Sequence, residues 1–246
     1  ITLSGGPGDN LLDAHLFTLG SVTLNGAAGN DTVKGGEGDD SLDGGEGVDE
    51  VHHTAEGSWE FYGYSVQGDI LSGFEQAVLS GMETNDYIRV DSHWGGTATI
   101  FGGEGNDTLK GGNNDDVLFG DAGNDSLLGV GGNDTLFGGE GNDKLLGHQY
   151  NWWSRDNFSG DDSLVGGEGD DTLTGDGGND TLLGEEGLDF LHGGYGSDLI
   201  DGASGNDSLH GGDSGDDTLF AGIGNDELDC GGARCLAWGG GGNDVI

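Results

Sequence analysis

A nine-residue repeat built on glycine is the feature that most restricts how this chain can fold. From Gly102 to Leu146 the sequence reads GGEGNDTLK, GGNNDDVLF, GDAGNDSLL, GVGGNDTLF and GGEGNDKLL without a gap. Three earlier repeats run from 26 to 52, and a later series begins at Asn157. A short fixed period indicates a solenoid, because one repeat is too small to bury its own apolar residues and must stack on its neighbours.

The composition excludes several classes of protein. Only 32% of the 246 residues are hydrophobic and 58 are glycine, so the chain cannot build the thick core of an ordinary globular domain. The 47 acidic residues against 6 Lys and Arg give a net charge of −41, which makes nucleic acid an implausible partner. No run reaches the 18 or so apolar residues of a membrane-spanning helix, so we expect no membrane insertion.

Each position of the repeat predicts a local structure. Glycine at the first and fourth positions suits a turn with positive φ and close backbone approach. One apolar residue at the eighth position, such as Leu109, Leu118 or Leu127, predicts a very short strand that points this side chain inward. The sixth position, or its counterpart outside the regular repeats, is aspartate at Asp31, Asp40, Asp49, Asp86, Asp107, Asp116, Asp125, Asp134, Asp143, Asp162, Asp171, Asp180, Asp189, Asp198, Asp207, Asp217, Asp226 and Asp244.

These aspartates are predicted to bind metal ions. Carboxylates stacked at the roughly 4.8 Å spacing of neighbouring strands repel one another strongly. Hard carboxylate and carbonyl oxygens at such turns are the ligands that Ca²⁺ prefers, so we expect roughly one calcium ion per nonapeptide. The alternative is a solvated acidic face, but a solvated face does not require one fixed register behind a glycine turn.

The motif GGxGxDxUx, as in GGEGNDTLK and GGEGDDTLT, resembles the repeats-in-toxin (RTX) proteins over about two thirds of the chain. The resemblance implies an all-β fold, a parallel β-roll or β-helix solenoid in which two nonapeptides make one 18-residue turn. It also implies calcium between successive loops, held by the sixth-position aspartates and backbone carbonyls, and secretion before folding outside the cell. Four positions depart from the motif and weaken the predicted sites beside them: Asn10, Asn114, Asn157 and Ala221.

The chain is expected to form one continuous solenoid with two parts. Residues 1–101 are predicted to form wider rungs that include the short nonapeptide block 26–52, because a shift of 76 residues aligns the first 36 residues with 77–112. Residues 102–246 are predicted to form the β-roll, interrupted by an aromatic loop at 147–156. Neither end of the sequence resembles a cap, so we expect a segment of a longer polypeptide.

Aromatic and apolar residues outside the core predict a contact surface. The loop 147–156 contains Tyr150, Trp152 and Trp153, and it is expected either to cover an apolar patch or to bind carbohydrate or a protein partner. Ninth-position residues should face outward, yet several are apolar, including Phe119 and Phe137. The loop or another protein surface is expected to cover the resulting apolar strips.

Neither the histidines nor the carboxylates form a recognisable catalytic group, and we expect no enzyme activity. His192 and His210 lie 18 residues apart, so they are either a stacked transition-metal pair or ordinary surface residues. Cys230 and Cys235 occupy the first and sixth positions of the unit CGGARCLAW. A disulfide is expected to close this loop in place of an ion, the alternatives being unrelated thiols or pairing with another chain.

Together these features predict a secreted, calcium-dependent structural solenoid, such as a segment of a surface layer, sheath, filament or adhesin. Its expected partners are calcium ions and either its own neighbours or another surface protein. The alternative is the non-catalytic module of a secreted protease, lipase or polysaccharide-modifying enzyme. Ice binding is less favoured, because the third positions, including Glu37, Glu104 and Tyr195, form a rough and charged row.

Overall fold

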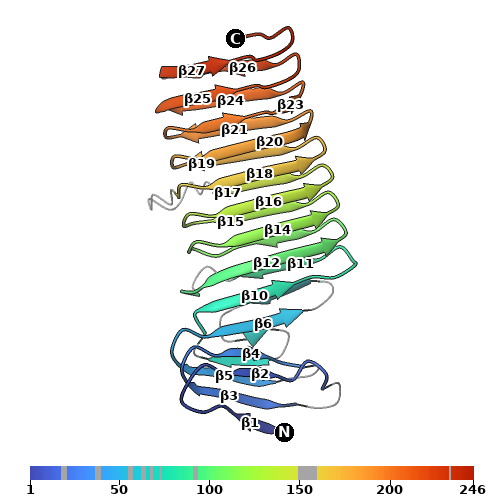
Figure 1. The fold of residues 1–246 in the computed structure, drawn as a ribbon, viewed down its shortest axis with the longest axis vertical. Helices are drawn as coiled ribbons and strands as arrows, with labels where there is room; N and C mark the ends of the chain where they lie inside the picture. The colour runs from blue at the N-terminus through green and yellow to red at the C-terminus, as the bar shows by residue number, and fades with distance from the viewer. Residues whose placement is uncertain are drawn as a thin grey trace.

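Short parallel strands wind into a β-solenoid of about 11 turns that runs from the N-terminus to the C-terminus (Figure 1). The computed structural model describes residues 1–17, 21–36, 40–54, 58–61, 65–66, 69–72, 74–90, 94–148, 160–232 and 234–246. Within these residues every strand pair is parallel except that of β8 with β9. The prediction of an all-β parallel solenoid is therefore confirmed.

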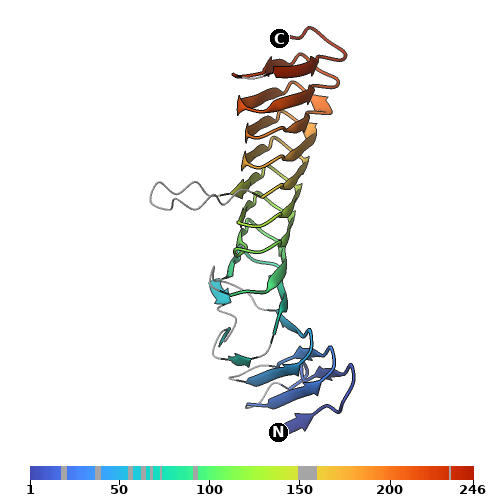
Figure 2. The ribbon, with the colours of Figure 1, turned by 90° about the vertical axis from the view of Figure 1, so that its left-hand side faces the viewer.

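Three sheets form the walls of the solenoid, and two of them face each other along most of its length (Figure 2). The N-terminal sheet contains β1 (Thr2–Ser4), β3 (Thr23–Ala28), β5 (Ser41–Glu46), β9 (Asp69–Ser72) and β8 (Ser65–Val66). The long sheet contains β2 (Leu11–Asp13), β4 (Thr32–Lys34), β6 (Glu50–Thr54), β10 (Gln76–Ser80), β12 (Thr97–Glu104), β14 (Val117–Ala122), β16 (Thr135–Glu140), β18 (Ser163–Glu168), β20 (Thr181–Gly187), β22 (Leu199–Asp201), β23 (Ser204–Gly205), β25 (Asp216–Phe220) and β27 (Arg234–Trp238). The opposite sheet contains β7 (Ser58–Phe61), β11 (Tyr87–Val90), β13 (Thr108–Lys110), β15 (Ser126–Val130), β17 (Lys144–His148), β19 (Thr172–Gly177), β21 (Phe190–Tyr195), β24 (Ser208–Ser214) and β26 (Glu227–Asp229).

The register between coils repeats the sequence period. Most neighbouring coils are offset by 18 residues, as where Leu118 pairs with Leu136, so each coil contains two nonapeptides. Coils outside the regular repeats are longer, with an offset of 21 residues between β10 and β12 and of 26 between β6 and β10. The insertion before Gly160 lengthens one coil to 28 residues without disturbing the pairing of β16 with β18.

Eighth-position side chains fill the narrow space between the sheets, as predicted. Leu109, Leu118, Leu127, Leu136 and Leu145 are all 0% exposed. Strands β10 and β12 each bury a second apolar residue, Ala77 beside Leu79 and Ala98 beside Ile100. Because each coil contributes so few apolar side chains, burial alone gives a coil little stability and stacking on its neighbours is essential.

Some predictions lie outside what the structure tests. The aromatic side chains Tyr150, Trp152 and Trp153 lie outside the described residues. The boundary near residue 101 stays a prediction, although the long sheet continues across it from β10 to β12. Among the described residues there is no helix of the length and hydropathy needed to cross a membrane.

Replacing Leu136 with alanine is expected to destabilise the solenoid by about 2–5 kcal/mol, because the cavity between its two stacked leucine neighbours cannot close. Leu188→Ala is the matched control, since Leu188 is 55% exposed and should tolerate the change. Urea unfolding in millimolar calcium measures both variants. Equal loss of stability in the two variants would contradict the assigned core.

Candidate metal centre

The turns bury nearly all of the aspartates predicted from the repeat. Seventeen of the eighteen are buried, and Asp244 in the last coil is partly exposed. Among the described residues these seventeen are the only buried acidic side chains. The sixth position therefore does not form a solvated acidic face, because its carboxylates point into the turn.

The aspartates form two columns, one along each edge of the solenoid. The long-sheet edge holds those that lie just before or at the start of the strands of the long sheet: Asp31, Asp49, Asp116, Asp134, Asp162, Asp180, Asp198 and Asp217. The opposite edge holds Asp86, Asp107, Asp125, Asp143, Asp171, Asp189, Asp207, Asp226 and Asp244, while Asp40 precedes β5 of the N-terminal sheet.

Within the described residues, one carboxylate oxygen of every one of these aspartates except Asp86 accepts a backbone N–H from the preceding coil. The backbone N–H of Asp116 donates to Asp134 Oδ1 at 2.9 Å, and the N–H of Asp134 donates to Asp162 Oδ1 at 2.8 Å. The same bond recurs along the opposite edge, for example from Asp107 to Asp125 at 2.7 Å. Each Oδ1 therefore acts as a bridge between neighbouring coils.

The second oxygen of most of these carboxylates is buried without a hydrogen-bond partner. Thirteen aspartates share this property: Asp31, Asp49, Asp107, Asp125, Asp134, Asp143, Asp171, Asp180, Asp189, Asp198, Asp207, Asp217 and Asp226. A buried charged oxygen without a partner is costly. Thirteen of them in one register indicate places for a cation.

At many turns a backbone carbonyl oxygen of the next coil lies beside the unpartnered Oδ2. A Cβ added at the first-position Gly138 would lie within 3.0 Å of both Asp143 Oδ2 and the carbonyl oxygen of Gly166, the first residue of the corresponding turn in the next coil. No three His, Cys, Asp or Glu side chains of the described residues converge to hold a metal, so carbonyl oxygens must supply most of the ligands. One carboxylate with several carbonyls is a hard oxygen set that fits Ca²⁺.

Burial raises the pKa values of these carboxyl groups in the ion-free protein. The pKa rises to about 7 at Asp125, Asp162 and Asp180 and to about 8 at Asp134, mainly through desolvation and further through neighbouring aspartates. In the ion-free protein, protonation would neutralise these carboxyl groups at the place where a bound cation would otherwise do so.

Comparison with protein families identifies these turns. The four-copy model of the RTX calcium-binding nonapeptide repeat matches residues 23–51, 95–127, 128–149, 156–191, 183–214 and 212–232, which together exceed half of the chain. The chain belongs to the RTX calcium-binding nonapeptide repeat family. No curated protein matches this RTX chain. The family's repeats bind calcium, and the buried oxygens of this chain fit that ion.

The structure corrects one departure from the motif and adds a residue that the sequence analysis missed. Gly147 takes the place of the first glycine in the turn of Asp162, because a Cβ there would meet Asp162 Oδ2; the repeat pattern assigns that place to Asn157, which lies outside the described residues. The insertion therefore lies within a repeat. Glu75 was missed because it lies outside the nonapeptides, yet its Oε2 accepts the N–H of Asp49 at 2.9 Å, as a sixth-position aspartate would.

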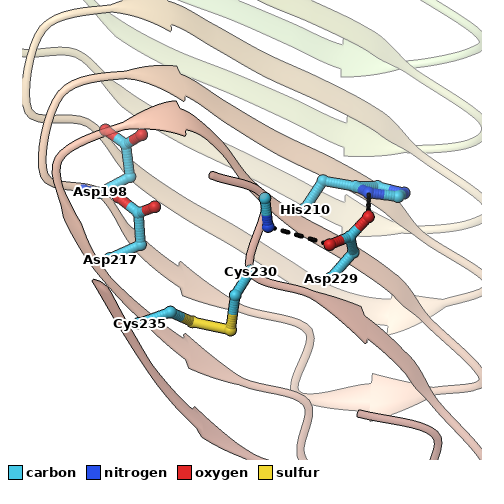
Figure 3. The surroundings of a disulfide bond; sticks show 7 residues. Asp198, His210, Asp217, Asp229, Cys230 and Cys235 are labelled. Atoms are coloured by element: carbon cyan, nitrogen blue, oxygen red, sulfur yellow. Dashed lines mark hydrogen bonds and ion pairs between the residues drawn. A yellow bond between two sulfur atoms is a disulfide. The ribbon is translucent and has the colours of Figure 1, made fainter. Parts of the chain in front are cut away.

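A disulfide joins Cys230 and Cys235, with 5.5 Å between their Cα atoms. Cys235 pairs in register with Asp217, so it continues the column that contains Asp198 and Asp217 (Figure 3). The last turn of the long-sheet edge thus has a covalent link at the place where its neighbours have a carboxylate.

The two stacked histidines do not form a metal site with a third ligand in the described part of the chain. The rings of His192 and His210 lie edge to face with 6.3 Å between their centroids. His210 Nδ1 lies 3.7 Å from Asp229 Oδ2 at the surface of the opposite sheet (Figure 3).

Gly138→Ala is expected to weaken calcium binding at its turn, because the new Cβ would displace Asp143 Oδ2 and the Gly166 carbonyl. Gly95→Ala is the matched control, since a Cβ there meets nothing within 4 Å. Isothermal titration with calcium should show fewer bound ions, or about tenfold weaker binding at the affected turn, for Gly138→Ala only. Equal binding by both variants would argue against the assigned ligand set.

Calcium affinity is expected to fall as the pH is lowered from 9 to 6, because the ion must displace protons from carboxyl groups whose pKa values reach about 8. The stability of the ion-free protein changes in the opposite sense. Folding raises these pKa values, so the folded chain binds more protons than the unfolded chain, and its stability is lost as the pH rises from about 4 to 8. Calcium titrations at three pH values, with proton release recorded, test the first statement. A pH-independent affinity would refute it.

Proposed function

We propose that this chain is a structural solenoid that folds outside the cell when calcium binds. The observation that carries the proposal is the set of thirteen buried Oδ2 atoms, each without a hydrogen-bond partner at the same place in its turn. The family match supports calcium as the ion. Extracellular modules bind calcium at concentrations of about 10⁻⁴–10⁻³ M, which suits folding after secretion.

Neutralisation of negative charge explains how calcium binding would drive folding. At a net charge of −41 the ion-free chain repels itself, and stacking would bury many of the repelling carboxylates together. In each turn the sixth-position aspartate and the neighbouring carbonyls would hold the ion. When bound, calcium supplies the positive charge that makes burial of the carboxylates favourable, so its binding energy becomes folding energy.

The role that we propose is not catalytic. The buried carboxylates all sit at one register, where their Oδ1 atoms accept backbone N–H groups from the preceding coil. Carboxyl groups used in this way bridge coils and are not positioned to transfer protons to a substrate. We therefore favour a structural segment of a surface layer, sheath, filament or adhesin.

The outer face of the long sheet supports packing against another protein surface. Its seventh- and ninth-position residues from β12 to β20 carry no charge. Phe101, Phe119 and Phe137 stack along it with ring centroids 4.8 and 4.9 Å apart. The opposite sheet carries Lys110 and Lys144 at corresponding positions. In a chain this acidic, an uncharged face of such length suits contact with protein, either a second copy or a neighbouring surface protein.

Removal of calcium is expected to abolish the folded state. Far-ultraviolet circular dichroism in excess chelator should show a disordered chain, and millimolar calcium should restore the β signal cooperatively, because each coil supports the next. Magnesium is the control ion, since its strict octahedral geometry suits these carbonyl-rich turns poorly. A β signal that persists in chelator would overturn the proposed switch.

Self-association in calcium is expected to depend on the long-sheet face. Phe119→Ser/Phe137→Ser should lower the sedimentation coefficient of the calcium-loaded chain toward that of a monomer, because the apolar contact is lost. Phe190→Ser is the control, since Phe190 is 42% exposed on the opposite sheet. A wild-type chain that sediments as a monomer at all concentrations would argue against a second copy as the partner.

A further inference from the structure

The backbone conformation of the second residue divides the turns into two classes. In the first class this residue has positive φ, as in Val130 at 98° and Gly139 at 115°. Every turn whose aspartate has an unpartnered Oδ2 belongs to this class. The second residues of these thirteen turns are Ala27, Gly45, Gly103, Asp121, Val130, Gly139, Gly167, Asp176, Glu185, Gly194, Ala203, Gly212 and Gly222. Gly231 in the disulfide turn and Gly240 in the turn of Asp244 also have positive φ.

Strained residues mark the same position. Among the described residues, six residues other than glycine have positive φ, and all six are second residues of such turns: Ala27, Asp121, Val130, Asp176, Glu185 and Ala203. A β-branched residue such as Val130 rarely adopts this conformation. Such strain persists only where the surroundings require it, and it clusters at functional sites.

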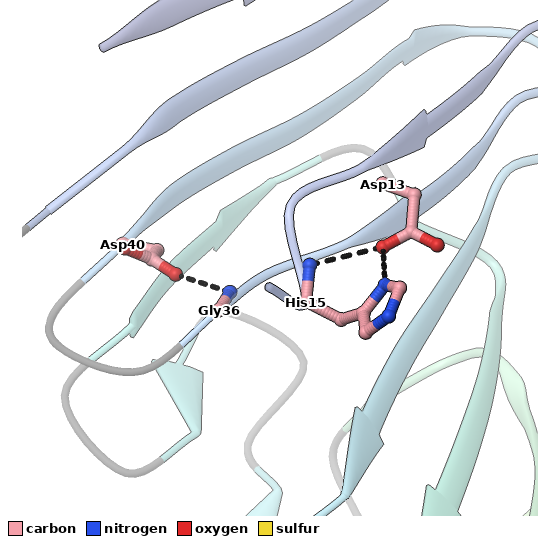
Figure 4. A network of polar contacts seen from close by, with 4 residues as sticks. All are labelled: Asp13, His15, Gly36 and Asp40. Carbon is pink, nitrogen blue, oxygen red and sulfur yellow. Dashed lines mark hydrogen bonds and ion pairs between the residues drawn. The ribbon is translucent and has the colours of Figure 1, made fainter. Parts of the chain in front are cut away.

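The second class contains the turns of Asp40, Asp86 and Asp116. Their second residues, Gly36, Met82 and Gly112, do not have positive φ. Instead the N–H of this residue donates to Oδ2 of the aspartate in its own turn, at 2.9 Å for Asp40 (Figure 4), 2.9 Å for Asp86 and 2.6 Å for Asp116. The chain itself therefore provides the partner that the first class lacks.

Asp116 and Asp134 show the difference most directly, because they are neighbours on the long-sheet edge and each is only 1% exposed. Asp116 accepts the N–H of Ala98 at Oδ1 and that of Gly112 at Oδ2, so both of its oxygens have donors. Asp134 accepts the N–H of Asp116 at Oδ1, and its buried Oδ2 has no hydrogen-bond partner. The two carboxylates are equally buried, but Asp134 accepts fewer backbone N–H groups than Asp116. Asp134 therefore has the greater need for a cation.

Asn10 provides a third arrangement at the first turn of the long-sheet edge. Its Nδ2 donates to the carbonyl oxygens of Gly6, at 3.1 Å, and Gly8, and to Asp31 Oδ1 at 3.0 Å. A Cβ at Gly5 would meet Asn10 Nδ2 in the way that one at Gly26 would meet Asp31 Oδ2. The amide group of Asn10 thus lies among oxygens of the kind that would ligate an ion.

We propose that calcium binds at the thirteen turns that combine a second residue of positive φ with an unpartnered Oδ2, most weakly at the turn of Asp226, whose first residue is Ala221, and that the turns of Asn10, Asp40, Asp86 and Asp116 are closed by the chain's own N–H groups without an ion. The inference rests on the proposed calcium binding and replaces one ion per nonapeptide with an uneven distribution. Two turns are not assigned to either class. The turn of Asp162 includes residues outside the described part, and Asp244 is partly exposed, although its second residue Gly240 has positive φ.

Loss of ions gives the first test. Calcium per chain is measured by mass spectrometry of the metal after equilibrium dialysis, with circular dichroism as the check of folding. Asp134→Asn should lower the count by at least one ion, whereas Asp116→Asn should keep the wild-type count because no ion is bound there. An equal loss in both variants would overturn the inference.

Gain of an ion gives the second test. Asn114→Gly restores the full GGxGxD motif at the turn of Asp116 and should raise the count by one ion per chain. Asn113→Gly is the matched control, because it changes the exposed neighbouring residue without restoring the motif. A wild-type count in folded Asn114→Gly would overturn the inference.

A third variant tests the N-terminal turn. Asn10→Asp replaces an amide donor by a carboxylate at the sixth position and should also add one ion. Asn124→Asp adds the same charge at an exposed fifth position and should add none. A wild-type chain that binds no calcium would overturn this inference together with the proposed function. A calcium-binding wild type whose variants do not separate in these ways would overturn the inference alone.

Discussion

The hydrogen bond from one backbone N–H to a carboxylate of the next coil is the interaction on which the rest of the structure depends. It fixes the distance and register of successive coils along both edges, as from Asp116 to Asp134 and from Asp107 to Asp125. It also pulls each carboxylate out of water, since the bonded oxygen is inside the turn. Each column of aspartates therefore carries the free-energy cost of burying a charged second oxygen, Oδ2, and that oxygen needs a partner.

The solenoid resolves that cost in different ways at different turns. At most turns Oδ2 is buried without a hydrogen-bond partner and suits a cation, while at Asp116 an N–H of the same turn donates to it. At the last turn of the long-sheet edge a disulfide occupies the positions of glycine and aspartate. With a core of essentially one leucine per repeat, stability depends on these edges more than on hydrophobic burial.

The sequence predicted the regular part of the molecule well, because each position of the repeat has one structural task. The inward leucines, such as Leu136, and the buried aspartates follow from the period alone. Prediction was weaker where the period is broken. Glu75 replaces an aspartate from outside any nonapeptide, and Gly147 is separated from Asp162 by an insertion. Both assignments depend on which coils lie side by side. The number of residues between two positions does not show this where the chain contains an insertion.

The sequence by itself determined the family and the stacked solenoid with acidic turns, because glycine, aspartate and leucine recur at a fixed short spacing and no single repeat can bury its own apolar residue. The tertiary structure decided which of those turns need an ion. Val130 and Gly112 are both second residues of a turn, yet one has positive φ and the other donates its N–H to an aspartate. The backbone orientation at this position depends on contacts with the coils on either side, and a repeat read by itself does not contain them.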